Sequence, residues 1–176
     1  MGFKGGFARQ AGFRLLEAII VAGVFIAIVA AALGKSAWDT RNDIIAVAST
    51  VQTVAETARS TYAGAGYGTA TMDFTLNTNR AFANPRYRVA VASGVATVTN
   101  QNNASVTVTG TTNNFTYSES GLSDAVCAGF TPRLTPMWAT VKIGAAAARP
   151  VPISATQAAT DCAALNGGAI VLTAVS

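Results

Sequence analysis

One acidic residue interrupts a long apolar stretch near the start of the chain. Residues 15–33 are apolar except for Glu17, which follows Gly12 by five positions. As a helix, these roughly 19 residues would extend about 28 Å, which is enough to cross the apolar core of a bilayer. A carboxylate inside such a span is costly unless a positive charge pairs with it. We therefore predict a functional role for Glu17.

The charges that flank this stretch predict its orientation. Lys4, Arg9 and Arg14 precede it without any acidic residue, whereas Lys35 and Arg41 behind it are balanced by two aspartates. Positive charge is retained on the cytoplasmic side of a membrane. The N-terminus is therefore expected in the cytoplasm and the remainder of the chain outside it.

Two cysteines, Cys127 and Cys162, lie in the exported part. Thiols are oxidised outside the cytoplasm, so the two are expected to form a disulfide. A metal site would need further soft or imidazole ligands, and the chain has no histidine. We expect no metal and no cofactor.

Residues suited to catalysis form no recognisable constellation. There is no histidine to act as a general base and no Gly-x-Ser-x-Gly turn. Glu119, Asp124 and Asp161 do not pair with a nucleophile in the sequence and are interpreted as surface or capping residues. The chain is not expected to be an enzyme.

The charge balance gives a weak indication of nucleic-acid binding. The formal charge of the whole chain is +4, but from residue 35 onward nine Lys and Arg face seven Asp and Glu, and 9 − 7 leaves +2. Arg80, Arg86 and Arg88 are close in sequence and are interpreted as a solvated face.

The residues around Gly12 resemble the class III signal of the type IV pilins. They read Gly12-Phe13-Arg14-Leu15-Leu16-Glu17, followed by Ala18-Ile19-Ile20-Val21. In that family, a membrane peptidase cuts after the glycine, and the new N-terminal residue is N-methylated. The resemblance implies cleavage between Gly12 and Phe13. It also implies that Glu17 pairs with the new amino group of Phe13 on a neighbouring subunit, for which Arg14 is the competing partner.

Two further segments, residues 60–69 and 153–162, resemble the type IVb subclass, which contains the toxin-coregulated, bundle-forming and conjugative-plasmid pilins. The first is similar to the Tyr- and Gly-rich exit from the long helix of those pilins, and the second to the short helix that carries their second cysteine. The resemblance implies that the Cys127–Cys162 bridge bounds a D-region, a surface segment used in subunit contacts and external binding.

The pattern behind the apolar stretch predicts the elements that position these residues. No proline interrupts residues 13–62, so the span and the amphipathic segment 35–62 can form one helix of about 75 Å. Its buried face is expected to carry Trp38, Ile45 and Val51 together with small residues. Gly34 is the weakest point of this helix, and the glycines of residues 64–68 end it.

The remaining sequence predicts an antiparallel sheet with two short helices. Strands are expected at residues 87–92, 96–99, 105–109, 114–118 and 137–143, and 145–152 is expected to be a loop. Residues 168–175 are apolar on both faces, as in a buried central strand. Short helices are expected at 120–130, carrying Cys127, and behind Ser154, which forms a capping box with Gln157.

Together these features predict an α+β chain with the type IV pilin fold: a long N-terminal helix, part membrane span and part amphipathic, packed on a C-terminal antiparallel sheet. The expected domains are a leader (1–12), a transmembrane and filament-core helix (13–34) and an extracytoplasmic globular domain (35–176). The resemblance implies a structural pilus subunit, cleaved by prepilin peptidase and polymerised by the pilus assembly machinery for adhesion, aggregation or conjugative mating. The precursor would reside in the bacterial inner membrane and the filament outside the cell.

Two other functions share part of this evidence. A minor pilin or a type II secretion pseudopilin would carry the same signal. A secreted binding domain behind an ordinary signal peptide would be cut near the small residues Ala30, Ala31 and Ala32. Glu17 inside the apolar core argues against that second alternative.

Overall fold

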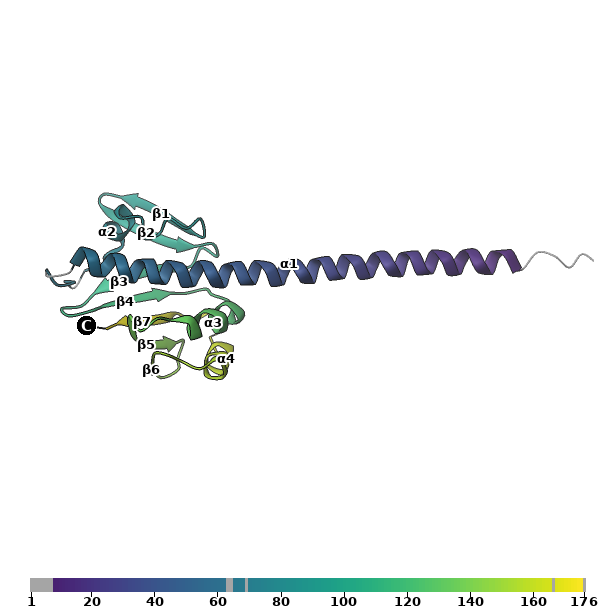
Figure 1. Cartoon of the computed structure of the whole chain (residues 1–176). Helices are drawn as coiled ribbons and strands as arrows, with labels where there is room; N and C mark the ends of the chain where they lie inside the picture. Colours follow the sequence, from purple (N-terminus) through teal and green to yellow (C-terminus); the bar gives the residue numbers. More distant parts are fainter. Residues whose placement is uncertain (1–7, 63–64, 69, 166, 176) are drawn as a thin grey trace, which may run out of the picture. The chain divides into compact units, whose positions relative to one another are not determined.

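The computed structural model describes residues 8–62, 65–68, 70–165 and 167–175, and of residues 8–33 and 35 it describes only the helical backbone. The chain divides into two compact units, Met1–Asp39 and Thr40–Ser176. Helix α1, Ala8–Tyr62, begins in the first unit and ends in the second (Figure 1). The prediction of one long helix is confirmed, and the helix continues through Gly34 without a break.

The glycine run behind α1 ends the helix as predicted. Gly66 and Gly68 have positive φ angles of 75° and 66°, which residues with a Cβ rarely adopt. The backbone can therefore turn at Gly66 and Gly68, ahead of the single bridge that Thr71 forms with Thr109.

The second unit contains a seven-stranded sheet with antiparallel neighbours, in the order β1-β2-β3-β4-β7-β5-β6. Its strands are β1 (Tyr87–Ala92), β2 (Val95–Asn100), β3 (Ser105–Gly110), β4 (Phe115–Glu119), β5 (Trp138–Ile143), β6 (Arg149–Pro150) and β7 (Ile170–Ala174). The last strand is central, as predicted. The expectation that both of its faces are buried is wrong, because Val171 and Thr173 on the outer face are only half-buried.

Residues 145–152, expected to be a loop, contain the two-residue strand β6. It pairs with β5 at the margin of the sheet, where a proline is tolerated because no further strand needs its missing N–H.

Three short α-helices complete the unit: α2 (Asp73–Thr78), α3 (Asp124–Phe130) and α4 (Ala155–Ala163), with a 3₁₀ turn at Thr131–Arg133 behind α3. The sequence predicted α3 and α4 but not α2. Serines cap the two predicted helices: the Ser123 hydroxyl accepts the Val126 N–H, and the Ser154 hydroxyl accepts the Gln157 N–H.

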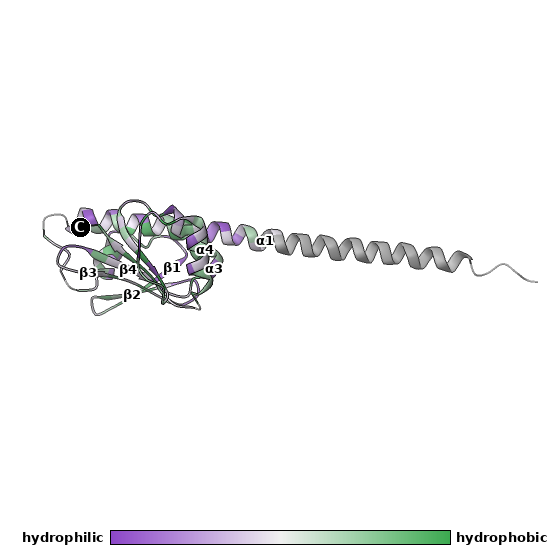
Figure 2. Cartoon of the chain, turned by 90° about the horizontal axis from the view of Figure 1, so that it is seen from below, coloured by the Kyte–Doolittle hydropathy of each residue, from purple (hydrophilic) through white to green (hydrophobic). Residues whose placement is uncertain are grey.

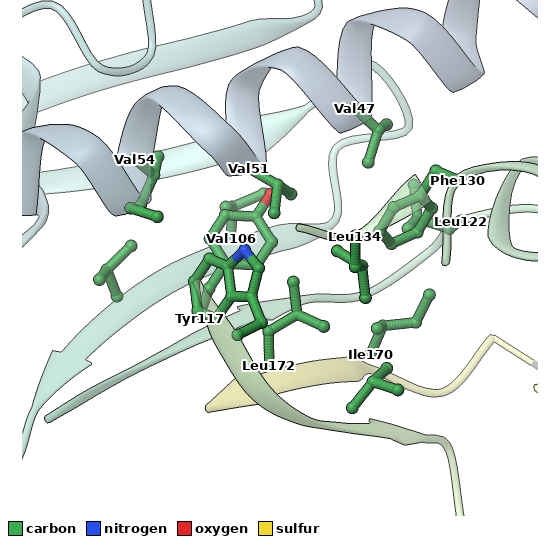
Figure 3. Close-up of a cluster of buried hydrophobic side chains, with 14 of the residues drawn as sticks. Val47, Val51, Val54, Val106, Tyr117, Leu122, Phe130, Leu134, Ile170 and Leu172 are labelled. Carbon is green, nitrogen blue, oxygen red and sulfur yellow. The ribbon is translucent and has the colours of Figure 1, made fainter. Parts of the chain in front are cut away.

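The hydrophobic core lies between residues 40–62 of α1 and one face of the sheet (Figure 2). Val47, Val51 and Val54 extend from α1 towards Tyr117 and Leu172 (Figure 3), and all five are at most 1% exposed. The strand register aligns the inner-face residues in rows. Val108 pairs with Tyr117, which pairs with Leu172, which pairs with Val141. A continuous apolar layer results.

The predicted buried face of α1 was partly wrong. Trp38 and Ile45 were expected to be buried, but they are 64% and 52% exposed. The stripe that contacts the sheet runs through Val47, Val51 and Val54. Ile45 lies about 120° around the helix from Val51, because six residues at about 100° each bring it to another side.

Candidate functional site

The predicted disulfide is present. Cys127 on α3 and Cys162 on α4 are bonded, with their Cα atoms 5.8 Å apart, and neither residue is exposed to solvent. The bridged cysteines are 35 positions apart in the sequence, and their bond holds the two helices together. These are the two residues that the type IVb resemblance places at the limits of the D-region.

The predicted processing and assembly residues, Gly12, Phe13 and Glu17, lie on the backbone of α1. Their side chains are outside the described part of the structure, so cleavage, methylation and charge pairing stay predictions. Within the part of the chain that the structure describes in full, no helix is apolar over a length sufficient to cross a membrane. The apolar stretch of residues 15–33 is not among those with described side chains.

An ion pair joins the globular half of α1 to the start of the sheet. Asp43 on α1 contacts the Arg86 guanidinium at 2.5 Å and accepts a hydrogen bond from the Gln101 amide at 2.8 Å. The Arg86 side chain is only 3% exposed, so the interpretation of this arginine as part of a solvated face was wrong. Arg80 and Arg88 are exposed, as that interpretation required.

Glu119 is also not the surface residue expected from the sequence. It is 1% exposed, and it accepts hydrogen bonds from the Tyr117 hydroxyl at 2.6 Å, the Tyr87 hydroxyl at 3.2 Å and the Asn100 amide at 3.1 Å. Burial raises the pKa of Glu119, while the hydrogen bonds from Tyr117 and Asn100 oppose this shift. Burial likewise raises the pKa of both tyrosines. The cluster is a closed polar network with no access for a substrate.

The other two candidate acids have separate environments. Asp161 on α4 forms an ion pair with Arg149 at 2.5 Å, and hydrogen bonding to Arg149 lowers the pKa of this carboxyl. The Gln157 amide also donates to Asp161, at 2.9 Å, and of the capping box predicted with Ser154 the structure shows the bond from the Gln157 N–H to the Ser154 hydroxyl, at 3.2 Å. Asp124 is exposed in the first turn of α3.

The described residues contain no group of three potential metal ligands. The three acids do not share a partner, and each engages a different element. We find no arrangement of these side chains that would perform acid–base or nucleophilic chemistry.

A shallow cavity of about 300 Å³ opens between α1 and the segment behind α3. Its lining is mainly apolar, and the charged group among its lining residues is Arg133. Gly129 on α3 lies against the Ile44 side chain of α1, so a residue with a Cβ at this position would force that side chain to move. The main lining residues are Ile45, Ala48, Val51, Phe130, Leu134 and Trp138.

The sequence contained a signal for Glu119 that our interpretation missed. Phe115, Tyr117 and Glu119 occupy alternate positions of one strand and therefore face the same side of the sheet. The two aromatic residues predicted that side to be the core. The pairing of Asp43 with Arg86 had no comparable signal, because it depends on how α1 lies against the sheet.

Comparisons with known proteins agree with this fold. A sequence model of the family described as PilS N terminal matches residues 41–175. The crystal structure of a type IVb pilin from Salmonella typhi superposes with a TM-score of 0.58 and 23% sequence identity, covering 71% of this chain and 95% of that one. No curated protein matches the chain. The matched residues include the whole sheet and both bridged helices, and the chain therefore belongs to the PilS family of type IV pilins.

Proposed function

We propose that this chain is a prepilin that becomes the repeating structural subunit of a type IV pilus. Residues 1–12 act as a leader, residues 13–34 as a membrane anchor and later as the filament core, and residues 35–176 as the extracytoplasmic domain. Prepilin peptidase cuts between Gly12 and Phe13, and the new N-terminus of Phe13 is methylated.

The observation that carries this proposal is the division of helix α1 between two units. Its last residues, 40–62, are part of a core that is complete within Thr40–Ser176, whereas residues 8–39 belong to the other unit. An apolar helical segment that is not used by the globular core is available for lipid and then for packing with like helices. Such a transfer keeps apolar surface away from water throughout assembly.

Glu17 sets the register of this assembly. A carboxylate in lipid or in a dry filament core is costly without a partner, and cleavage creates an amino group on Phe13. A pair between Glu17 of one subunit and Phe13 of the next would fix their axial offset. Contacts of this kind join unlike surfaces, so they repeat into an open filament.

The precursor resides in the inner membrane and the polymer outside the cell, where it serves adhesion, aggregation or conjugative mating. Its abundance in sheared filaments distinguishes a major pilin from a minor pilin. A type II secretion pseudopilin would not yield abundant long filaments.

The mass of the mature chain tests the proposal. Filaments sheared from cells should contain a chain that begins at N-methylated Phe13. Gly12→Lys should leave a membrane-retained precursor and abolish filaments, while the matched control Gly6→Lys, which adds the same charge within the leader, should be processed normally. A mature chain beginning near Gly34 would show ordinary signal-peptide cleavage and refute the proposal.

A further inference from the structure

Strand β1 forms an open edge of the sheet (Figure 1). Ala92 and Val95 flank the two-residue turn Ser93–Gly94, whose φ angles of 51° and 79° are those of a tight hairpin. In such a hairpin, the pair beside the turn is hydrogen-bonded and alternate residues point their N–H and C=O groups outward. On β1 these outward residues are Val89 and Val91. Within the described chain, no hydrogen bond satisfies their outward groups.

This edge lacks the features that normally protect one. β1 has no proline or lysine, and its only charge is Arg88 near the start of the strand. Val91 is 52% exposed, and Val95 across the turn is 65% exposed. An exposed apolar strand of six residues is a template for pairing with another strand.

The opposite edge of the sheet is protected. β6 has two residues, Arg149–Pro150, and the proline has no N–H to donate. The Arg149 side chain is held by Asp161. A β1 strand could therefore not add to the β6 edge of another copy, which leaves a second β1 as the complementary edge within this chain.

Two antiparallel β1 strands fit each other when the two-fold axis passes beside Ala90. Val89 of each copy then faces Val91 of the other, and their outward groups form four reciprocal hydrogen bonds. Arg88 lies opposite Ala92, so the two arginines are offset along the strands by roughly 13 Å and do not repel strongly. Valine contacts valine on one face of the joined sheet, and small residues meet on the other.

We infer that the β1 edge is a lateral contact between two copies of this chain, formed by antiparallel β1–β1 pairing about Ala90. A two-fold contact closes on itself and cannot lengthen a filament. This placement rests on the proposed pilus function: the contact links subunits of two neighbouring filaments. Each contact is small, but its repetition along two filaments gives a stable bundle through multivalency.

A cysteine at the axis tests the pairing. Residues facing each other in a non-hydrogen-bonded pair have Cα atoms about 4.5 Å apart, which suits a disulfide. The native cysteines are bonded to each other, so Ala90→Cys in the full-length protein adds a free thiol. We expect a dimer on a non-reducing gel that reductant removes. Ala92→Cys is the matched control: it is equally exposed, but its two copies would lie roughly 13 Å apart and should remain monomeric. Equal dimer from both variants, or from neither, would overturn the pairing.

A second pair of variants separates bundling from filament growth. Val91→Pro removes an outward N–H that the sheet does not use, so the fold should persist while lateral bundles are lost. Val91→Thr keeps the N–H and the branched shape and should bundle normally. Both variants should still assemble filaments in electron micrographs, single in Val91→Pro and bundled in Val91→Thr. Loss of filaments themselves in Val91→Pro, with the subunit still folded, would show a growth contact and refute the lateral assignment. Absence of filaments in the wild type would instead contradict the proposed function, while the Ala90→Cys dimer would still report on the edge.

Discussion

Asp73 is a buried carboxyl whose replacement should stabilise the protein. It begins helix α2, is 3% exposed and accepts a hydrogen bond from the Val108 N–H at 2.8 Å. The pairing of β2 with β3 ends at Val106, so no residue of β2 accepts the Val108 N–H. The Asp73 carboxyl accepts it instead. Burial raises the pKa of the carboxyl from 3.8 to about 6, and the bond from Val108 opposes that shift only in part.

The direction of the pH effect follows from this shift. Because the folded state holds the proton more tightly than the unfolded chain, the free energy of unfolding falls as the pH rises from 3.8 to about 6 and loses no more above it. At about 1.36 kcal/mol for each pH unit, the penalty at neutral pH is about 2 to 3 kcal/mol. Asp73→Asn keeps an acceptor for the Val108 N–H and removes the charge. It should therefore be more stable than the wild type by about that amount at pH 7, and equally stable below pH 4.

Urea unfolding of the full-length protein in detergent, followed by tryptophan fluorescence, measures this difference. Trp138 is 1% exposed and reports on the core, and Trp38→Phe removes the exposed second tryptophan. The control Asp73→Leu also removes the charge, but it leaves the Val108 N–H without a partner and should gain much less. The reasoning would be refuted if the free energies of unfolding of the wild type and Asp73→Asn differed by the same amount at pH 4 and pH 7. It would also be refuted if Asp73→Asn were less stable than the wild type at pH 7.

Three further outcomes follow from the other sites. Replacing Cys127 and Cys162 together by alanine removes a bridge between residues 35 positions apart. On the chain-entropy model, this should lower the free energy of unfolding by about 4 kcal/mol, and fewer filaments should reach the surface. Unchanged urea unfolding curves would contradict this expectation. Asp43→Asn leaves the buried Arg86 without its carboxylate and should lower the free energy of unfolding by about 2 kcal/mol. Arg86→Met removes the buried charge as well and should lower it less, and the same urea titration shows which variant is less stable. The Glu17→Ala variant should be inserted and cleaved but should fail to assemble. If it formed filaments at normal yield and with an unchanged helical rise, Glu17 would not set the axial register between subunits.

Local patterns predicted most of the fold. The absence of proline in α1, the glycines behind it and the runs of Val, Thr and aromatic residues in β1 to β4 each determine an element from its own residues. The bridge was predictable as well, because the chain has only two cysteines. The interior place of β7 was expected from its apolar residues, but its neighbours β4 and β5 were not predicted, because periodicity alone cannot identify the partners of a strand.

The failures concern side chains whose environment depends on distant segments. Ile45 has the spacing of a buried residue, but the rotation of α1 on the sheet leaves it exposed. Arg86 is buried because Asp43 reaches it from another element. Helix α2 was missed because it has only six residues, too few for a helical period to emerge from the sequence. The candidate assembly residues near Gly12 remain predictions from a local motif.

The position of β7 also suggests an order of folding events during the export that we propose. No ladder joins β4 to β5 directly, so the sheet stays in two pieces until Ile170–Ala174 pairs with both. Cys162 leaves a translocation channel before Ile170, so the bridge to Cys127 has time to form first. Oxidation would then precede sheet closure and shorten the search of the final strand for its site. A chain that stalls before its last residues would keep its sheet in two unpaired pieces that a protease could cut.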